Sequence, residues 1–377
     1  MAYVLAGCCA VLGLILSRSH LVTLIILVYF WILFALNIDS PDSSNFEYMY
    51  YNINTAIYEL YEPGFVWLCK ISLFFDLTYQ EFRMVVATIY IFFLILSIKD
   101  YTIDRNLVLV LFLIYPFLGH VSGLRSALGA VFAFYSFHYL LQDKKSNLIK
   151  YIFGILFATM FHYSSIAFLL LLFARTKVKV QTLLIINICL MFSLMIGLRF
   201  DLFLFLATKV INNAKPLTWL DYSAVDQPSL IVLMVPVILL MIQIYLFYRA
   251  KHLVFRSVSG VELSSNELYR KNQKSIFDNR FSWHVMERVN ILLLLVIAGY
   301  TLNLTYARLT DVILPMQYSV YAYAISKPIN HDCDGGFRIK KQFLYVLMFC
   351  LVLQMFWALF FHGNIQIPVL KDNLLFT

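Results

Sequence analysis

Long apolar segments recur from one end of this chain to the other, and they limit its fold more than any other feature. Many run for roughly 15–22 residues, enough to cross a hydrocarbon core about 30 Å thick as a helix. The chain is 62% hydrophobic and only 13% charged, a balance that soluble globular domains do not have. We therefore predict an all-α polytopic integral membrane protein of one domain, residues 1–377, with about 11–12 transmembrane or re-entrant helices.

Basic residues predict the orientation of these segments, because cytoplasmic loops carry an excess of lysine and arginine. Most basic residues fall in alternate connections, near 18, 99–105, 144–145, 175–179, 249–288 and 327–341. These connections are expected inside, which leaves outer loops at 37–83 and 198–228 and places both termini outside. The predicted spans are 2–16, 20–36, 84–98, 106–119, 125–141, 148–160, 163–174, 180–197, 229–248, 289–304, 312–326 and 342–361.

The apolar run between the basic loops 142–147 and 175–179 is too short for ordinary crossings. Both loops are expected inside, so the run of about 27 residues must cross twice or dip in and return, although a comfortable crossing takes about 20. Its turn is predicted at residues 161–165. Irregular backbone at this depth is tolerated where it lines a buried or watery cavity. His162 is therefore expected at the bottom of an outward-facing recess.

Several classes of partner are not expected. The net charge of +8 lies in the predicted cytoplasmic loops, where it attracts anionic lipids, so no nucleic-acid partner is predicted. The six cysteines imply no disulfide framework. No nucleotide loop, dinucleotide fingerprint or zinc-protease helix is present. The segment HDCDGG, residues 331–336, lacks partner ligands, so we predict neither metal nor cofactor.

The outer loop 37–83 mixes acidic and aromatic side chains, a combination that suits carbohydrate. Carboxylates accept hydrogen bonds from hydroxyl groups, and aromatic rings stack on the apolar faces of sugars. The predicted sugar-binding residues are Tyr48, Tyr51, Glu62 and Trp67. The alternative is an aromatic belt at the membrane interface. Residues 62–80 are amphipathic, which predicts a helix lying along the membrane surface.

Three further residues on the outer side suggest chemistry on an anion. Arg125 stays charged at a cost of roughly 2.5–3.5 kcal/mol near hydrocarbon, so it is predicted to bind phosphate, with snorkelling to the headgroups as the alternative. Arg308 is a second phosphate ligand or the ion-pair partner of Asp311. Histidine exchanges protons near neutral pH, so His162 transfers a proton or is simply a packed histidine.

These segments resemble a known family. DSPDSSNFEYMYYN, EPGF, GLRSALG at the start of a span and FHYSS inside an apolar run resemble the EpsG-type branch of Wzy-like polysaccharide polymerases. YARLTD before a late span is similar to that family's C-terminal arginine segment. The likeness is close over most of residues 37–175 and is mainly topological elsewhere. It implies a GT-C-like polymerase architecture.

The resemblance implies a glycosyltransferase of the bacterial inner membrane. It would transfer undecaprenyl-diphosphate-linked repeat units to one another at the periplasmic face, building O antigen of lipopolysaccharide or capsule. Arg125 and Arg308 would hold the diphosphate, and His162 would assist the acceptor or leaving group. The base would be one of the carboxylates Asp39, Asp42 and Glu47. Its implied partners are the lipid-linked oligosaccharide, membrane lipids, a chain-length regulator and a flippase.

Two other classes of function remain open. A flippase or transporter of the same lipid-linked oligosaccharide would carry charges through a central cavity and show repeat symmetry. A related ligase or acyltransferase would share the scaffold. The polar groups of this chain gather on one face, which favours chemistry at the outer surface.

Overall fold

The computed structural model describes most of the chain as helices. The described residues are 1–40, 42–55, 61–102, 104–199, 230–258, 275–300, 308–326, 334–361 and 363–375. Within these ranges there is no β-strand, and one isolated antiparallel bridge joins Asn37 and Asn373. Four of the described helices are long and apolar enough to cross a membrane, and shorter apolar helices accompany them. The prediction of an all-α multi-pass membrane protein is confirmed.

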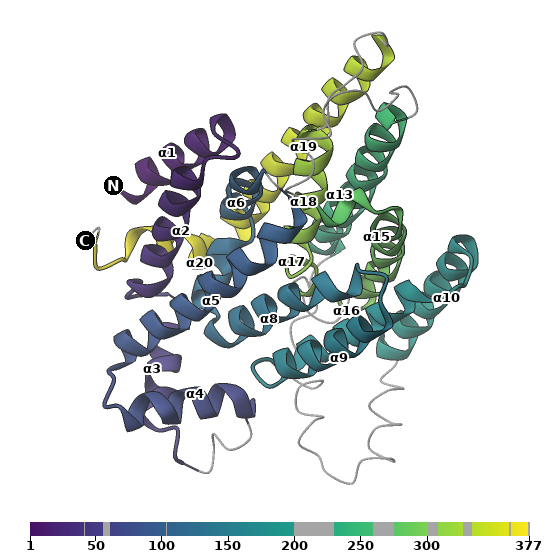
Figure 1. Ribbon diagram of the computed structural model, residues 1–377. Helices are drawn as coiled ribbons and strands as arrows, with labels where there is room; N and C mark the ends of the chain where they lie inside the picture. The colour runs from purple at the N-terminus through teal and green to yellow at the C-terminus, as the bar shows by residue number, and fades with distance from the viewer. Residues whose placement is uncertain are drawn as a thin grey trace.

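The elements follow one another through the bundle shown in Figure 1. In chain order they are α1 (Ala2–Ile15), α2 (His20–Ala35), α3 (Ser43–Tyr51), α4 (Pro63–Phe74), α5 (Tyr79–Tyr101), α6 (Arg105–Ile114), α7 (Phe117–Ser122), α8 (Leu124–Leu140), α9 (Lys145–Thr159), the 3₁₀ helix η2 (Tyr163–Arg175), α10 (Val180–Arg199), α13 (Leu230–Val258), η3 (Ile276–Asp278), α15 (Arg280–Leu292), η4 (Leu293–Leu295), α16 (Val296–Tyr300), α17 (Arg308–Asp311), α18 (Leu314–Ser326), α19 (Asp334–Phe361) and α20 (Gly363–Lys371).

Helix α18 lies at the centre of the bundle and is buried on all sides from Leu314 to Ala324. A helix that is enclosed in this way must satisfy its polar groups internally, because no water is available. Gln317 donates to Asn290 Oδ1 at 2.8 Å, and the Tyr318 hydroxyl donates to the Tyr115 carbonyl at 3.0 Å. These bonds fasten α18 to α15 and to the end of α6.

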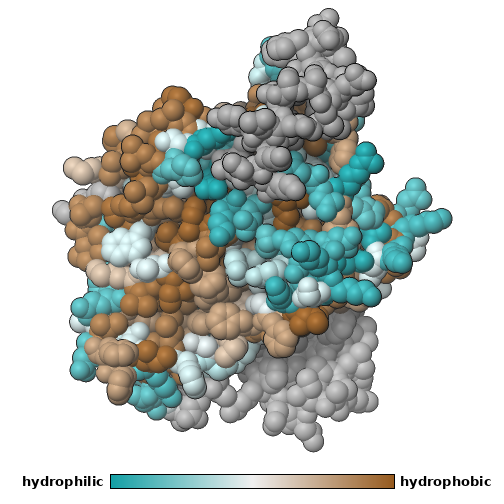
Figure 2. All heavy atoms as spheres, viewed as in Figure 1, coloured by the Kyte–Doolittle hydropathy of each residue, from teal (hydrophilic) through white to brown (hydrophobic). Residues whose placement is uncertain are grey.

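In contrast to the buried helix α18, helices α1 and α2 have apolar side chains that face outward. Val11, Ile15, Leu21 and Leu24 are all exposed, and Figure 2 shows brown, hydrophobic residues gathered over this side of the molecule. Single exposed apolar residues are ordinary, but a continuous surface of them is typical of contact with lipid. This surface fits the multi-pass fold.

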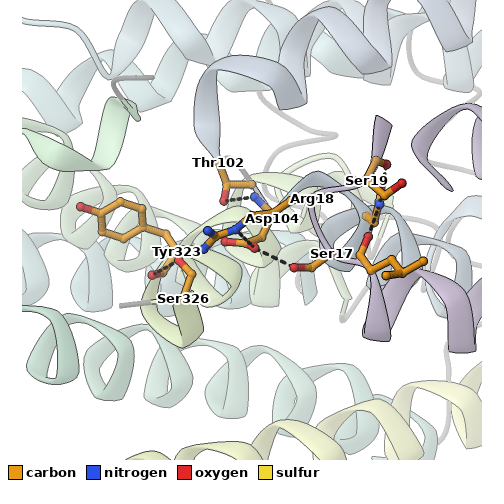
Figure 3. Close-up of polar contacts among 9 residues, drawn as sticks. Ser17, Arg18, Ser19, Thr102, Asp104, Tyr323 and Ser326 are labelled. Carbon is orange, nitrogen blue, oxygen red and sulfur yellow. Dashed lines mark hydrogen bonds and ion pairs between the residues drawn. The ribbon is translucent and has the colours of Figure 1, made fainter. Parts of the chain in front are cut away.

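A polar cluster joins the α1–α2 turn to the α5–α6 turn (Figure 3). The buried Asp104 carboxylate accepts from Ser17 Oγ at 2.8 Å and from Arg18 Nε at 2.9 Å, and the Asp104 N–H donates to Thr102 Oγ1 at 3.1 Å. Arg18 and its neighbours were predicted to face the cytoplasm. The cluster ties the two turns together at that end of the bundle.

The two termini lie on the same side of the molecule (Figure 1). The Tyr29 hydroxyl, near the end of α2, donates to the carbonyl of Ala2. The C-terminal segment pairs with the residues after α2, where the Leu374 N–H donates to the Leu36 carbonyl at 2.9 Å. Both termini therefore lie at the end of the bundle from which the loop 37–83 starts.

Several boundaries differ from the predicted spans for identifiable reasons. The predicted span 106–119 is broken into α6 and α7 at Pro116, because proline has no N–H to continue a helix. The predicted span 289–304 belongs to a helix that starts earlier, at Arg280, where Asn279 Oδ1 accepts from the Phe281 N–H. The loop 37–83 contains α3 and α4. The outer loop 198–228 lies almost wholly outside the described residues, as do residues 331–333 of HDCDGG.

The short apolar run after Lys145 forms two antiparallel segments, α9 and η2, which pack against each other. The return predicted near residues 161–165 is confirmed, since α9 ends at Thr159 and η2 begins at Tyr163. A 3₁₀ helix rises about 2 Å per residue, so η2 reaches roughly 26 Å with few residues. His162 caps this turn in an extended conformation.

Candidate functional site

Glu62 stands at the centre of a charged cluster that three separate parts of the chain build. It is the N-cap residue of α4 and is 1% exposed. Its Oε2 atom accepts from Arg125 Nη1 of α8 at 2.6 Å, and its Oε1 atom lies 3.3 Å from His162 Nδ1. The Tyr163 N–H also donates to Oε1, at 3.4 Å. One carboxylate therefore joins the predicted phosphate ligand to the predicted proton-transfer residue.

Two aromatic rings also lie against the Arg125 guanidinium. Its Cζ atom lies 4.6 Å from the Tyr61 ring centroid and 5.7 Å from the Phe46 ring centroid. A cation over a ring face is attracted by the ring quadrupole, more strongly where water is excluded. The Arg125 side chain is 24% exposed. Its orientation toward Glu62 and these rings does not fit a side chain that snorkels freely.

Two glycines allow the close approach that brings the site together. The Gly64 N–H donates to the Met160 carbonyl at 2.8 Å, and a Cβ on Gly64 would lie 2.9 Å from that oxygen. On α8, a Cβ on Gly129 would lie 2.6 Å from the His162 Cβ. Any larger residue would push α4 or α8 away from the α9–η2 turn. The site thus depends on glycine at these two contacts.

Arg308 lies beside the start of α8, close to this cluster. Its Nη1 atom is 4.0 Å from the position that a Cβ would take on Gly123, the N-cap residue of α8. Gly123 has no side chain to cap the helix, and the N–H groups at the start of a helix favour anions. Arg308 is exposed, and among the described residues no ion pair joins it to Asp311. The intramolecular pair considered above is not formed.

The electrostatics of Glu62 are dominated by its neighbours. Burial opposes ionisation, but the hydrogen bond with His162 and the charge of Arg125 lower the pKa of Glu62 to about 2. The carboxylate is therefore anionic at physiological pH and acts only as an acceptor. The Glu62–Arg125 pair carries little net charge.

The other predicted site residues lie on α3 and α4 or just before α3. Asp39 and Glu47 are exposed and Asp42 is partly exposed, and the structure shows no side-chain bond from these three, within the described part of the chain, to Glu62, Arg125 or His162. Tyr48 and Trp67 are also exposed, Trp67 at 71%. The Tyr51 hydroxyl accepts from the Tyr79 N–H at 3.2 Å. The structure therefore brings Arg125, His162 and Glu62 into contact. The other predicted site residues do not join this cluster through a side-chain bond within the described part of the chain.

The described residues contain no cluster of metal ligands. No group of three or more histidine, cysteine or carboxylate side chains in the described ranges is arranged to hold a metal ion. The side chains that converge can donate hydrogen bonds to phosphate, through two arginines, and can transfer a proton, through one histidine.

The fold and this cluster define a class: a multi-pass helical membrane protein with arginines and a histidine gathered near the end of the bundle where its termini lie. The sequence matches the EpsG family over residues 20–371. The chain therefore belongs to the EpsG family, a family of Wzy-like polymerases. Membership supports a polymerase-like role in polysaccharide synthesis and, in general terms, glycosyltransferase activity of that type. No curated protein and no solved structure matches the chain.

Sequence reasoning missed how central Glu62 is. It predicted a sugar contact there, because an acidic residue stood among aromatic residues. The useful signal was its place directly before Pro63 and Gly64, since proline favours the first position of a helix and an acid at that end complements the helix dipole. The rings of Phe46 and Tyr61 gave no sequence signal for contact with Arg125.

Proposed function

We propose that this protein polymerises surface polysaccharide at the outer face of the bacterial inner membrane. In each cycle it transfers an oligosaccharide repeat unit from undecaprenyl diphosphate to a hydroxyl of another lipid-linked unit. The observation that carries the proposal is the convergence of Arg125 and His162 on one buried carboxylate, with Arg308 beside the same helix start. Membership of the EpsG family supports polysaccharide as the polymer.

The chemistry requires a proton acceptor and a stabilised leaving group. The acceptor hydroxyl oxygen attacks the anomeric carbon of the donor, and its proton passes to the Nε2 atom of His162. The bond between the anomeric carbon and the diphosphate oxygen breaks, and that oxygen keeps the electron pair. Arg125, Arg308 and the N–H groups at the start of α8 stabilise the developing charge. Groups aimed at charge that forms in the transition state contribute most to such catalysis.

The residues around the cluster complete the proposed site. Tyr48, Tyr51 and Trp67 would stack on or bond to the sugars, and one of Asp39, Asp42 and Glu47 remains a candidate base beside His162. Their exposure leaves them accessible to a large substrate. Membrane lipids surround the bundle, and a flippase and a chain-length regulator are the proposed protein partners. The loops 37–83 and 198–228 and both termini would then be periplasmic.

The deciding experiment is deletion of the gene followed by gel analysis of the surface glycan. We expect glycan that carries a single repeat unit, because translocation and attachment remain intact. A flippase or ligase would instead lose surface glycan altogether, and that result would refute the polymerase. Complementation with the wild-type gene must restore the full ladder, whereas His162→Ala expressed to the same level must not.

A further inference from the structure

We propose that Glu62 is the positioning residue of this site: its carboxylate fixes His162 in the tautomer that presents Nε2 to the acceptor hydroxyl, while it orients Arg125 toward the diphosphate. This inference rests on the proposed function and deepens it. It replaces the sugar contact that the sequence suggested for Glu62.

The tautomer follows from the contacts of the carboxylate. An ionised carboxylate has no hydrogen to donate, so the 3.3 Å contact between Glu62 Oε1 and His162 Nδ1 requires the proton to sit on Nδ1. In a neutral imidazole the other nitrogen, Nε2, then carries the lone pair. The low pKa of Glu62, about 2, keeps this arrangement throughout the physiological range. His162 is left with one nitrogen that is able to accept a proton.

The same carboxylate sets the direction of Arg125. A guanidinium has five N–H donors in a planar fork, and Glu62 takes one of the two on Nη1, at an N–O distance of 2.6 Å. The rings of Tyr61 and Phe46 restrict the plane of that fork. Arg125 Nε is buried and has no partner among the described residues. Glu62 thus holds the arginine at one corner and leaves other donors for phosphate oxygens.

Glu62 is itself held firmly enough to do this. Its backbone carbonyl accepts from the Val66 N–H in the first turn of α4, and the same turn is docked by the bond from the Gly64 N–H to the Met160 carbonyl. The Tyr163 N–H, adjacent to His162, also donates to Glu62 Oε1. Among the described residues, the charged group in contact with the imidazole is Glu62, which in turn contacts Arg125. The contacts with Arg125, His162 and the Tyr163 N–H therefore hold the Glu62 carboxylate in place and stabilise its charge.

The test uses full-length protein in vesicles, with synthetic prenyl-diphosphate-linked oligosaccharide as both donor and acceptor. Glu62→Gln keeps the shape of the side chain and removes its charge. We expect kcat to fall by about 10²-fold or more, within the range of general acid–base effects, while the Kd for the donor changes by less than about threefold.

A double-mutant cycle separates positioning from a merely structural role. In a His162→Ala background, Glu62→Gln should cost less in kcat than it does in the wild type, because residues that act as a unit are not additive. Glu62→Asp, which keeps the charge but withdraws it by one methylene, should lower kcat by less than Glu62→Gln does. Glu287→Gln, which removes another ion-paired glutamate, 2.8 Å from Lys251, is the matched control and should behave as wild type.

Two results would overturn the inference, and they differ from failure of the proposed function. If Glu62→Gln retains kcat within about threefold, Glu62 does not position His162. If Glu62→Gln cannot be purified, the Glu62→Asp variant decides, since wild-type kcat in that variant would equally refute the role. If wild-type protein itself forms no polymer under any condition, the proposed function has failed instead.

Discussion

Arg125 Nη1 and Glu62 Oε2 lie 2.6 Å apart although 63 positions separate the two residues in the chain. The Glu62 side chain is only 2% exposed, so the arginine compensates a carboxylate that burial would otherwise penalise. Arg125, which the sequence predicted as a phosphate ligand, therefore already contacts an anion, the Glu62 carboxylate. A diphosphate bound as we propose would share the guanidinium with Glu62.

Replacing Arg125 with glutamine should destabilise the protein as well as inactivate it. Removing one partner of a buried ion pair leaves the other charge without compensation, at a cost of roughly 3 kcal/mol when the arginine is partly exposed. Thermal unfolding in detergent should show a clear fall in the midpoint. Arg125→Lys keeps the charge, so its midpoint should stay close to that of wild type, while the loss of bidentate geometry shortens the glycan ladder. Normal chain length in Arg125→Lys at normal expression would exclude bidentate binding there.

The pH dependence of stability should report the Glu62 ion pair. The pKa of Glu62 is about 2, below its ordinary value of 4.5, so the folded state favours the ionised form. The contribution is fully present above pH 4.5 and is lost as the pH falls through about 2. Its size is roughly 3 kcal/mol. The unfolding midpoint of wild type should drop toward that of Glu62→Gln as the pH is lowered, and a constant gap between them down to the lowest pH would contradict this.

Gly129→Ala should impair activity without changing any charge. The added methyl carbon would lie 2.6 Å from the His162 Cβ and 3.0 Å from Ser165 Oγ. Either α8 or the α9–η2 turn must move, and a displacement of about 1 Å at a catalytic group can cost on the order of 10²-fold in rate. Gly7→Ala is the matched control, because nothing lies within 4 Å of its added carbon. In vitro polymerisation compares the two, and equal rates would show that His162 tolerates the shift.

Arg308→Gln should weaken donor binding and leave the fold intact. Its side chain is exposed and none of the ion pairs in the described part of the chain includes it, although its charge acts on the buried Asp311 carboxyl. A charge-assisted bond to phosphate contributes roughly 1.5–3 kcal/mol, so the Kd for the lipid-linked donor should rise by about 10-fold or more. Lys145→Gln removes one charge from an exposed position and serves as the control. An unchanged Kd together with a lowered melting temperature would assign Arg308 a structural role instead.

The sequence determined the class of this protein because the relevant physics is local. A helix that crosses a membrane must be about 20 apolar residues long, and it must satisfy its own backbone, so spans are visible as runs of letters. The two basic loops around the 148–174 run likewise predicted the return at His162, since loop charge is also a local property. Boundaries such as the start of α15 at Arg280 were missed, because only tertiary packing buries Ser282, Trp283 and Arg288 in an otherwise polar segment.

The tertiary structure alone decided how the site is assembled. Glu62 meets His162 across 100 positions and Arg125 across 63. Those meetings depend on the docking of Gly64 against Met160 and of Gly129 against His162, contacts of a few ångströms that no periodicity encodes. Only the folded chain could show that the carboxylate assigned to sugar is the partner of both the arginine and the histidine. A buried charge needs a partner, and which partner it has is set by packing.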